Sequence, residues 1–248
     1  MPYALIDVMA QIVLVTSSAY LLMRSLGMML RLRRAKNAYP KEVPIANSTP
    51  EAGLKSGRYD RHRGALVGLA VGDALGLPAE SLPPWLLPLR YRRGPRMQRG
   101  LVRFFRRAGA ISDDTQLSIC VARSISPEGS YLHERFRDEL CLWYGYRIAA
   151  GRATTQAVRR LRRGNRDDPG DPKSEGNGAA IRVAPLAMAH AEDLDDTDLI
   201  ADVKDNARLT HRADKAVSGS VFWALLVWEA LRHPRSEMSH DALEGLFV

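Results

Sequence analysis

From residue 59 onward, apolar positions recur at the three- and four-residue spacing of amphipathic helices. No segment alternates apolar and polar residues between turn signals, as a half-buried strand does. The pattern therefore predicts an all-α domain, with helices over residues 61–77, 115–124, 132–149, 154–163, 178–191, 198–209 and 215–232.

The first predicted helix carries four glycines spaced four residues apart, at Gly64, Gly68, Gly72 and Gly76. Each glycine costs about 1 kcal/mol of helix propensity relative to alanine. Residues four apart lie on one helix face, so this face lacks side-chain bulk. We expect another backbone to approach it closely, because the lost propensity has to be offset by packing.

Residues 1–35 differ from the rest of the chain, because no charge occurs over residues 8–23 and a basic segment follows Arg24. A spanning helix needs roughly 20 apolar residues, so Asp7 and Arg24 would have to reach the two interfaces. Three interpretations stay open: a membrane anchor or interfacial helix, a helix packed on the domain, and an upstream start that is not used. A membrane anchor would hold the basic flank, and the domain after it, in the cytoplasm.

The domain organisation follows from these changes in composition. Residues 36–58 are rich in proline, glycine and polar residues and are predicted to be a linker. Residues 59–248 are predicted to form the domain itself, which is long enough for one core. The two cysteines, Cys120 and Cys141, lie in apolar helical patterns without metal-ligand spacing and are expected to be core thiols in a reducing compartment.

The chain is basic, with a net charge of +8 and arginine clusters over residues 90–107 and 159–166. Such clusters suit phosphate, nucleic acid or an anionic membrane, or they are solvated helix faces of an arginine-rich protein. No nucleic-acid reading motif accompanies these arginines. We therefore expect no nucleic-acid partner.

The most informative string is Ser112-Asp113-Asp114-Thr115, directly before a predicted helix. Carboxylate and hydroxyl oxygens are the ligands that hard divalent cations prefer, so the string is typical of part of a magnesium site. Asp113 and Gln116 also fit a capping box that fixes the first turn of a helix. The string alone leaves both interpretations open.

Two more acids lie in or just after the glycine-rich helix. Pro78 is expected to end that helix, which places Glu80 in a loop where it can face another acidic turn or lie in solvent. Asp73 stands among apolar residues, where a carboxylate is expected to be buried. It then needs a hydrogen-bond partner or a place behind a metal ligand, and we favour the latter.

Two further motifs suit ligand binding. The Gly176-Asn177-Gly178 turn opens a predicted helix, so its N–H groups can point at an anion, although a plain glycine-rich helix start fits as well. His211 follows Thr210 between two predicted helices. A histidine at such a place is usually a helix-end cap or a surface residue.

Four strings in order, over residues 72–80, 112–115, 174–182 and 209–212, resemble those of the ADP-ribosylglycohydrolase family, which includes the dinitrogenase reductase-activating glycohydrolases. The resemblance implies an orthogonal all-α bundle of many helices that binds two magnesium ions. It also implies hydrolysis of the glycosidic bond between ADP-ribose and a protein side chain, with ADP-ribose or an ADP-ribosylated protein as the partner.

The resemblance also assigns roles to particular residues. Ser112, Asp113, Asp114 and Glu80 resemble metal ligands, and the three carboxylates among them resemble the catalytic acids. Contacts to ADP-ribose are implied for five residues, namely Ser174, Gly176, Asn177, Gly178 and His211.

The family's second metal string, Asp-Thr-Asp-Thr in a glycine-rich stretch, does not follow His211 in this sequence. Asp196-Thr197-Asp198 precedes His211, lacks the glycines and is expected to cap a helix. We therefore expect a domain incomplete at its C-terminus, with half of the two-ion site. The leading hypothesis is de-ADP-ribosylation, and the alternative is a catalytically inactive ADP-ribose-binding or inhibitory module, tethered to a membrane if the N-terminal segment is an anchor.

Overall fold

The structure, a computed structural model, describes residues 56–80, 82–92, 94, 109–148, 150–193 and 195–233. Among these residues no strand occurs, and the only β-type pairings are two isolated bridges. The predicted all-α fold class is confirmed. In chain order the elements are α2 (Ser56–Gly76), η1 (Leu77–Ala79), η2 (Pro84–Leu86), α3 (Leu87–Arg90), α4 (Asp113–Arg123), α5 (His133–Trp143), α6 (Arg152–Leu161), η3 (Ala180–Arg182), α7 (Ala184–Ala189), α8 (Thr197–Arg208) and α9 (Asp214–Arg232).

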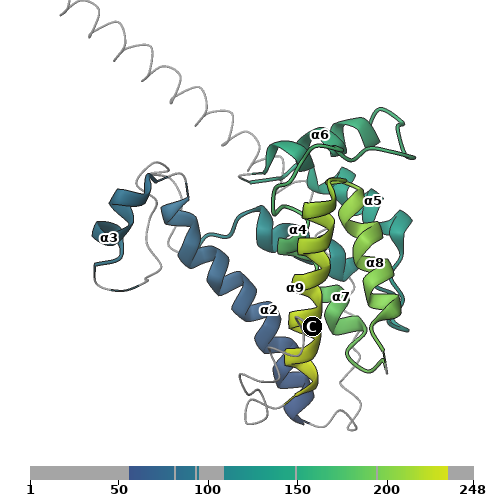
Figure 1. The fold of residues 1–248 in the computed structure, drawn as a ribbon, viewed down its shortest axis with the longest axis horizontal. Coiled ribbons are helices and arrows are strands. Elements are labelled where there is room, and N and C mark those ends of the chain that lie inside the picture. The colour runs from purple at the N-terminus through teal and green to yellow at the C-terminus, as the bar shows by residue number, and fades with distance from the viewer. Residues whose placement is uncertain are drawn as a thin grey trace, which may run out of the picture. The chain divides into compact units, whose positions relative to one another are not determined.

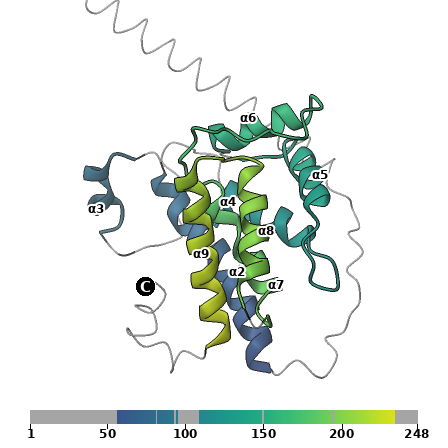
Figure 2. The same cartoon turned by 45° about the vertical axis from the view of Figure 1, so that its right-hand side comes forward.

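One apolar core lies among helices α4 to α9. Figure 1 shows α9 in yellow beside α8, with α6 across one end of the group, and Figure 2 shows α8 and α9 side by side from a second direction. Each of these helices turns an apolar face inward, and each large buried side chain contributes roughly 1.5–3 kcal/mol. The core cluster consists of Leu117, Cys120, Val121, Phe136, Leu140, Trp143, Val158, Leu161, Val183, Leu186, Ala187, Leu199, Val203, Leu209, Ala224 and Trp228.

Most predicted helices exist, with shifted ends. Helix α2 begins at Ser56, inside the segment predicted to be a linker, and Pro78 follows its end as expected. Helix α5 ends at Trp143, six residues before the predicted end at residue 149, because the chain turns at Tyr144 and Gly145.

The helix predicted over residues 178–191 is wrong as a single element. The chain forms a turn at residues 177–179, then the short η3, and α7 begins only at Ala184. Pro185 explains the break, since proline has no N–H to donate and its ring clashes with the carbonyl four residues earlier in a continuous helix. Proline is tolerated in the first turn of α7, where the N–H groups lack helical acceptors anyway.

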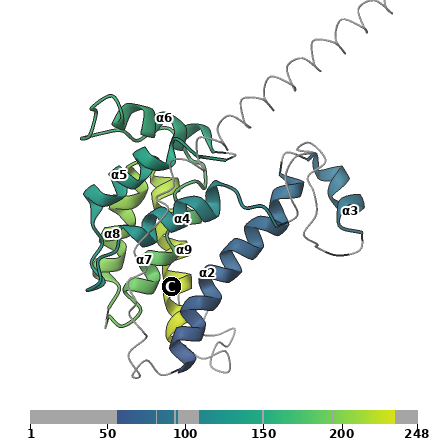
Figure 3. The same ribbon diagram turned by 180° about the vertical axis from the view of Figure 1, so that it is seen from behind.

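Helix α2 runs antiparallel to α9. The beginning of α2 contacts the end of α9, where Arg61 Nε donates to the carbonyl of Leu231 at 2.8 Å. From this contact α2 slants away from α9, which is clearest from behind in Figure 3. The expectation that a second backbone packs on the glycine face is wrong within the described residues. A Cβ atom placed at any of its four glycines would meet no atom within 4 Å there.

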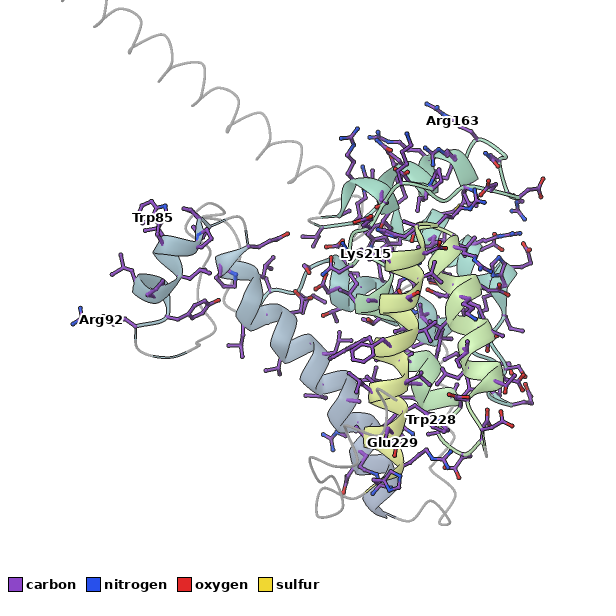
Figure 4. The ribbon with its side chains drawn as sticks, in the orientation of Figure 1. Trp85, Arg92, Arg163, Lys215, Trp228 and Glu229 are labelled. Atoms are coloured by element: carbon purple, nitrogen blue, oxygen red, sulfur yellow. The ribbon has the colours of Figure 1, made fainter. Side chains whose placement is uncertain are left out.

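None of the helices in the described ranges is long and apolar enough to cross a membrane. The anchor predicted for residues 1–35 lies outside those ranges, as does most of the first arginine cluster. The second cluster covers the last turn of α6 and the residues after it, where Arg160 donates to the carbonyl of Pro169 and Arg166 forms ion pairs with Glu134 and Asp138. This pattern agrees with arginines spread over a solvated helix face. Figure 4 shows Arg163 at the outer edge of this region.

A histidine clamp joins the end of α7 to α8. His190 Nδ1 lies 2.5 Å from Asp193 Oδ2, and its Nε2 lies 2.8 Å from Asp202 Oδ2. The His190 carbonyl accepts a hydrogen bond from Trp228 Nε1 of α9 at 2.7 Å, and Figure 4 marks Trp228 on that helix. The hydrogen bond to Asp202, reinforced by Asp193, raises the pKa of His190 to about 8.

We expect folding stability to fall as pH rises through this pKa. Because the pKa of His190 is raised above its unfolded value of 6.5, the stabilisation is fully present below pH 6.5 and is lost as pH passes 8. The expected loss between pH 6 and pH 9 is about 2 kcal/mol. Urea denaturation at both pH values measures it, and His190→Gln should remove this part of the pH dependence. Equal slopes for the two proteins would contradict the clamp.

Candidate active site

The acidic turn forms the start of α4. Ser112 is its N-cap, with Oγ accepting the Asp114 N–H at 3.2 Å, and Asp113 and Asp114 occupy the first turn. The predicted capping box between Asp113 and Gln116 is wrong. The cap lies one residue earlier, and Gln116 Oε1 instead accepts from Trp143 Nε1 at 3.0 Å and from the Ile148 N–H.

Asp73 of α2 holds this turn in place. Its Oδ2 accepts hydrogen bonds from Ser112 N at 2.7 Å, Thr115 N at 3.2 Å and Thr115 Oγ1 at 2.6 Å. The side chain is partly exposed, not buried as expected, because it also borders an open cavity. The hydrogen-bond partners that an acid within this helix requires are therefore backbone and hydroxyl groups of α4, and Asp73 lies directly behind the predicted ligands.

Asp113 points away from Asp73, toward the loop before α6. The residue is buried, and its Oδ2 accepts the Gly151 N–H at 3.1 Å. Burial, together with the charges of Asp114 and Glu80, raises the pKa of Asp113 to about 7 against the lowering effect of the Gly151 hydrogen bond. Asp113 is thus a carboxyl group that titrates near neutral pH.

Asp114 and Glu80 complete the acidic cluster. Burial raises the pKa of Asp114, and the nearby charges of Asp73 and Glu80 add to that rise. Glu80 lies in the turn after η1 and is exposed. The structure thus brings Glu80 close enough to act on both aspartates, across more than thirty positions of sequence.

The donor chemistry of this cluster suits magnesium. Hard carboxylate and hydroxyl oxygens converge here, and the mutual repulsion of Asp73, Asp113, Asp114 and Glu80 is the kind that a divalent cation relieves. No three His, Cys, Asp or Glu side chains in the described ranges lie close enough to hold a metal ion by themselves. Magnesium commonly takes only one or two carboxylates and keeps several waters, so the donor set fits that mode.

A cavity of about 870 Å³ lies between α2 and α9. Its walls are apolar, with Gly64, Gly68 and Leu69 on one side and exposed aromatic residues of α9 on the other. Asp73, Asp114 and Asn177 lie at one end, and Arg61 and Leu231 lie at the opposite end. The acidic turn and the glycine loop, about sixty residues apart in sequence, therefore face the same space.

The glycine loop is the second part of the site. Gly176 and Asn177 are exposed, and Ser174 Oγ lies near Gly176 at the inner side of the loop. Lys215, labelled on α9 in Figure 4, forms an ion pair with Glu175 at 3.0 Å at the edge of the loop. The predicted dipole of a long helix is absent, because only the three-residue η3 follows the turn.

His211 lies beneath this loop and is only 3% exposed. It is therefore neither of the things that such a histidine usually is, a surface residue or a helix-end cap, and its ring packs against the backbone of Gly178. An isolated bridge between Asp171 and His211 fixes the backbone on both sides. The structure thus places Ser174, the glycine loop and His211 together.

Replacing Gly178 with alanine is expected to destabilise the chain. A Cβ there would lie 2.8 Å from His211 Cε1 and 3.2 Å from Thr154 Oγ1, so the buried ring would have to move. Overpacking of this kind costs about 1–3 kcal/mol. Gly176→Ala is the matched control, since its Cβ would meet no atom closer than 3.7 Å. Thermal denaturation of both variants measures the difference, and equal midpoints would contradict the close packing.

The Asp196-Thr197-Asp198 string lies at the start of α8, as predicted. Asp196 is the N-cap residue, and the neighbouring Asp195 Oδ1 accepts the Thr197 N–H at 3.0 Å. None of the three residues lines the cavity. The string therefore forms the N-terminus of α8 and is not part of the cavity.

Sequence reasoning missed the role of Arg182, Gly151 and Thr154. Arg182 is buried and bonded to the glycine loop and to Thr210, while Gly151 and Thr154 contact Asp113 and the loop, respectively. A signal existed only for Arg182, which stands in an otherwise apolar run of residues 179–184. Gly151 and Thr154 carry no sequence pattern that marks them.

The fold and site together define an all-α protein with an acidic helix start and a glycine loop facing one cavity. A family model described as ADP-ribosylglycohydrolase matches residues 54–247. The chain therefore belongs to the ADP-ribosylglycohydrolase family, as the four strings indicated.

Relatives with described activities support this membership. An ADP-ribosylarginine hydrolase, Tri1, of Pseudomonas putida is 32% identical over 180 residues, which cover 68% of this chain and 45% of that protein. An ADP-ribosyl-[dinitrogen reductase] glycohydrolase of Rhodospirillum rubrum is 33% identical over 159 residues, covering 62% of this chain and 52% of that protein. This chain thus spans about half the length of these relatives.

A solved structure agrees in fold. It is described as an ADP-ribosylglycohydrolase-related protein complex, and its TM-score with this chain is 0.61 at 32% identity. The match covers 77% of this chain and 62% of that one. The arrangement of helices seen here is therefore that of the family.

Proposed function

We propose that this chain binds ADP-ribose at the glycine loop and acts in hydrolysing the glycosidic bond between ADP-ribose and a protein side chain. The observation that carries the proposal is the joining of Asp73, Asp114 and Asn177 at one end of a single cavity. Relatives of the chain are hydrolases of ADP-ribosylarginine and of ADP-ribosylated dinitrogen reductase. The substrate class is accordingly an ADP-ribosylated protein.

We further propose that the acidic cluster binds magnesium with Asp114 as the carboxylate nearest the cavity, and with Asp113, Glu80 and the Ser112 hydroxyl holding the ion directly or through its waters. Support comes from the hard oxygen donors and from the raised pKa values of both aspartates, which burial raises most and the neighbouring carboxylates raise further. A bound magnesium ion would supply a positive charge that orients ribose hydroxyls and acidifies a water molecule.

The three aspartates of the site have different roles in this proposal. Asp114 faces the cavity, so it is the carboxylate placed to contact the ligand or a water molecule. Asp113 lies behind it with a pKa of about 7, which suits a group that takes up a proton near neutral pH. Asp73 fixes the backbone that carries both aspartates. Cleavage of a glycosidic bond through an oxocarbenium-like transition state commonly uses a pair of carboxylates, which Asp113 and Asp114 would supply here.

The test is incubation of the full chain with ADP-ribosylarginine and magnesium chloride, followed by chromatography for free ADP-ribose. Release that depends on both magnesium and Asp114 is the expected result. A second series replaces arginine by other ADP-ribosylated amino acids. If no linkage releases ADP-ribose, the hydrolytic part of the proposal is wrong.

A second candidate function is ADP-ribose binding without turnover. It is favoured by the position of Asp113, whose carboxylate accepts the Gly151 N–H and does not line the cavity, so that this group has no direct access to a ligand there. This function predicts that ADP-ribose binds while ADP-ribosylarginine stays intact over hours. Turnover by the chain on its own would exclude it.

A further inference from the structure

Arg182 of η3 is a buried cation with no acidic partner among the described residues. Its Nε donates to Asn206 Oδ1 and its Nη2 to the Asn206 carbonyl, both at 2.8 Å. Burial lowers the pKa of Arg182 to about 10, so the side chain stays charged at neutral pH. Burying an unpaired charge costs free energy of folding. An apolar side chain at this position would make the core more stable, so the arginine needs another explanation.

Its other hydrogen bonds lead to the candidate site. Nη1 donates to the carbonyl of Gly178 at 3.2 Å, and Nη2 donates to Thr210 Oγ1 at 2.9 Å. Arg182 therefore holds the glycine loop and the residue before His211 at the same time.

The hydroxyl proton of Thr210 has two possible acceptors. His211 Nδ1 lies 2.8 Å from Oγ1, whereas the Ala207 carbonyl lies 3.5 Å away. That carbonyl already accepts from the Thr210 and His211 N–H groups, so both of its lone pairs are in use. Since Thr210 Oγ1 accepts from Arg182, its proton goes to His211 Nδ1, the shorter contact.

His211 Nδ1 then accepts, and the ring proton of the neutral imidazole must lie on Nε2. Burial and the charge of Arg182 lower the pKa of His211 to about 4, so the ring is neutral at physiological pH. Nε2 makes no hydrogen bond within the described residues, although the side chain is almost fully buried. A Cβ atom at Gly178 would lie 3.1 Å from Nε2, and one at Gly176 would lie 3.7 Å from it, so Nε2 is close to the glycine loop.

We propose that Arg182 is a positioning residue that acts through Thr210 to fix His211 as the Nε2–H tautomer, which donates to an acceptor oxygen of the ligand at the glycine loop. A phosphate or other anionic oxygen satisfies this donor, whereas an ammonium group does not. That the ligand is ADP-ribose rests on the proposed function, but the position of the proton does not.

Nitrogen NMR of the uniformly labelled full chain tests the proton position directly. The imidazole signals of His211 are assigned by their loss in His211→Gln. At pH 7 the free wild-type chain should show Nε2 protonated and Nδ1 unprotonated. Thr210→Val removes the hydroxyl at similar volume, so a population with the proton on Nδ1 should appear.

Calorimetric titration of the same proteins with ADP-ribose gives the second readout. Thr210→Val should bind about tenfold more weakly, the effect of losing one well-oriented hydrogen bond. Thr210→Ser keeps the hydroxyl and should match the wild type in both experiments, which separates the hydroxyl from general loss of folding.

Two results would overturn the inference: a wild-type ring protonated on Nδ1, or a folded Thr210→Val chain with wild-type affinity. A wild-type chain that shows the Nε2–H tautomer but does not bind ADP-ribose would instead refute the proposed function, and phosphate or diphosphate would then be titrated against the same ring signals. If none of the three ligands, ADP-ribose, phosphate or diphosphate, shifts the Nε2 signal of His211, the ligand contact itself is refuted.

Discussion

Asp73→Ala is expected to destabilise the fold by about 3 kcal/mol, because one carboxylate oxygen accepts three hydrogen bonds from the start of α4. Two backbone N–H groups of the helix start would lose their acceptor. Asp73→Asn keeps one acceptor oxygen, so it should cost about 1 kcal/mol. Urea denaturation at pH 7 measures both values.

The matched control for this substitution is Asp60→Ala in the same helix. Asp60 is exposed, so its replacement should change stability by less than about 0.5 kcal/mol. If Asp73→Ala unfolds at the same urea concentration as Asp60→Ala, then Asp73 does not hold α4. The acidic turn would then be positioned by its own cap at Ser112.

Asp114→Asn is expected to weaken magnesium binding by about a hundredfold, since it removes a charged oxygen ligand from the cavity end of the cluster. Stability without metal should not fall, because burial and the charges of Asp73 and Glu80 already disfavour the ionised carboxylate. Weaker binding with unchanged folding is typical of a functional site. Calorimetric titration with magnesium chloride in the presence of ADP-ribose measures the affinity.

Asp198→Asn provides the matched control for Asp114→Asn. Both aspartates lie in the first turn of a helix, but Asp198 is exposed at the start of α8, outside the cavity. Its replacement should leave magnesium affinity unchanged. Equal effects of the two substitutions would show that any ion binding is nonspecific.

Much of the fold could be predicted because its helices carry clear start and stop signals. The start of α4 at an acidic turn and the end of α2 before Pro78 follow from capping chemistry and from the geometry of proline. The break at Pro185 was equally visible but was outweighed by the apolar run around it. There the apolar periodicity indicated one continuous helix, whereas the backbone restriction of proline indicated a break, and the structure follows the proline.

The candidate site was predictable only in part. Asp113, Asp114 and Glu80 were identified as oxygen donors, and the structure brings them together, where burial and then their like charges raise the pKa values of both aspartates. Sequence could not show that Asp114 faces the cavity while Asp113 turns toward Gly151, because both lie in the same helical turn. That division depends on tertiary contacts from α2 and from the loop before α6.

The opposite failure concerns His211 and the glycine face of α2. A histidine between two helices is usually a cap or a surface residue, yet long-range pairing with Asp171 buries His211. The glycines were expected to be covered, yet Gly64 and Gly68 line an open cavity among the described residues. Burial depends on which elements meet, and neither local pattern specifies that.

Calorimetric titration of the full chain with ADP-ribose, in the presence and absence of magnesium, tests the central claim most directly. The account predicts saturable binding to one site, strengthened by magnesium and weakened by Asp114→Asn but not by Asp198→Asn. A folded chain that shows no heat of binding with ADP-ribose under either condition would contradict it.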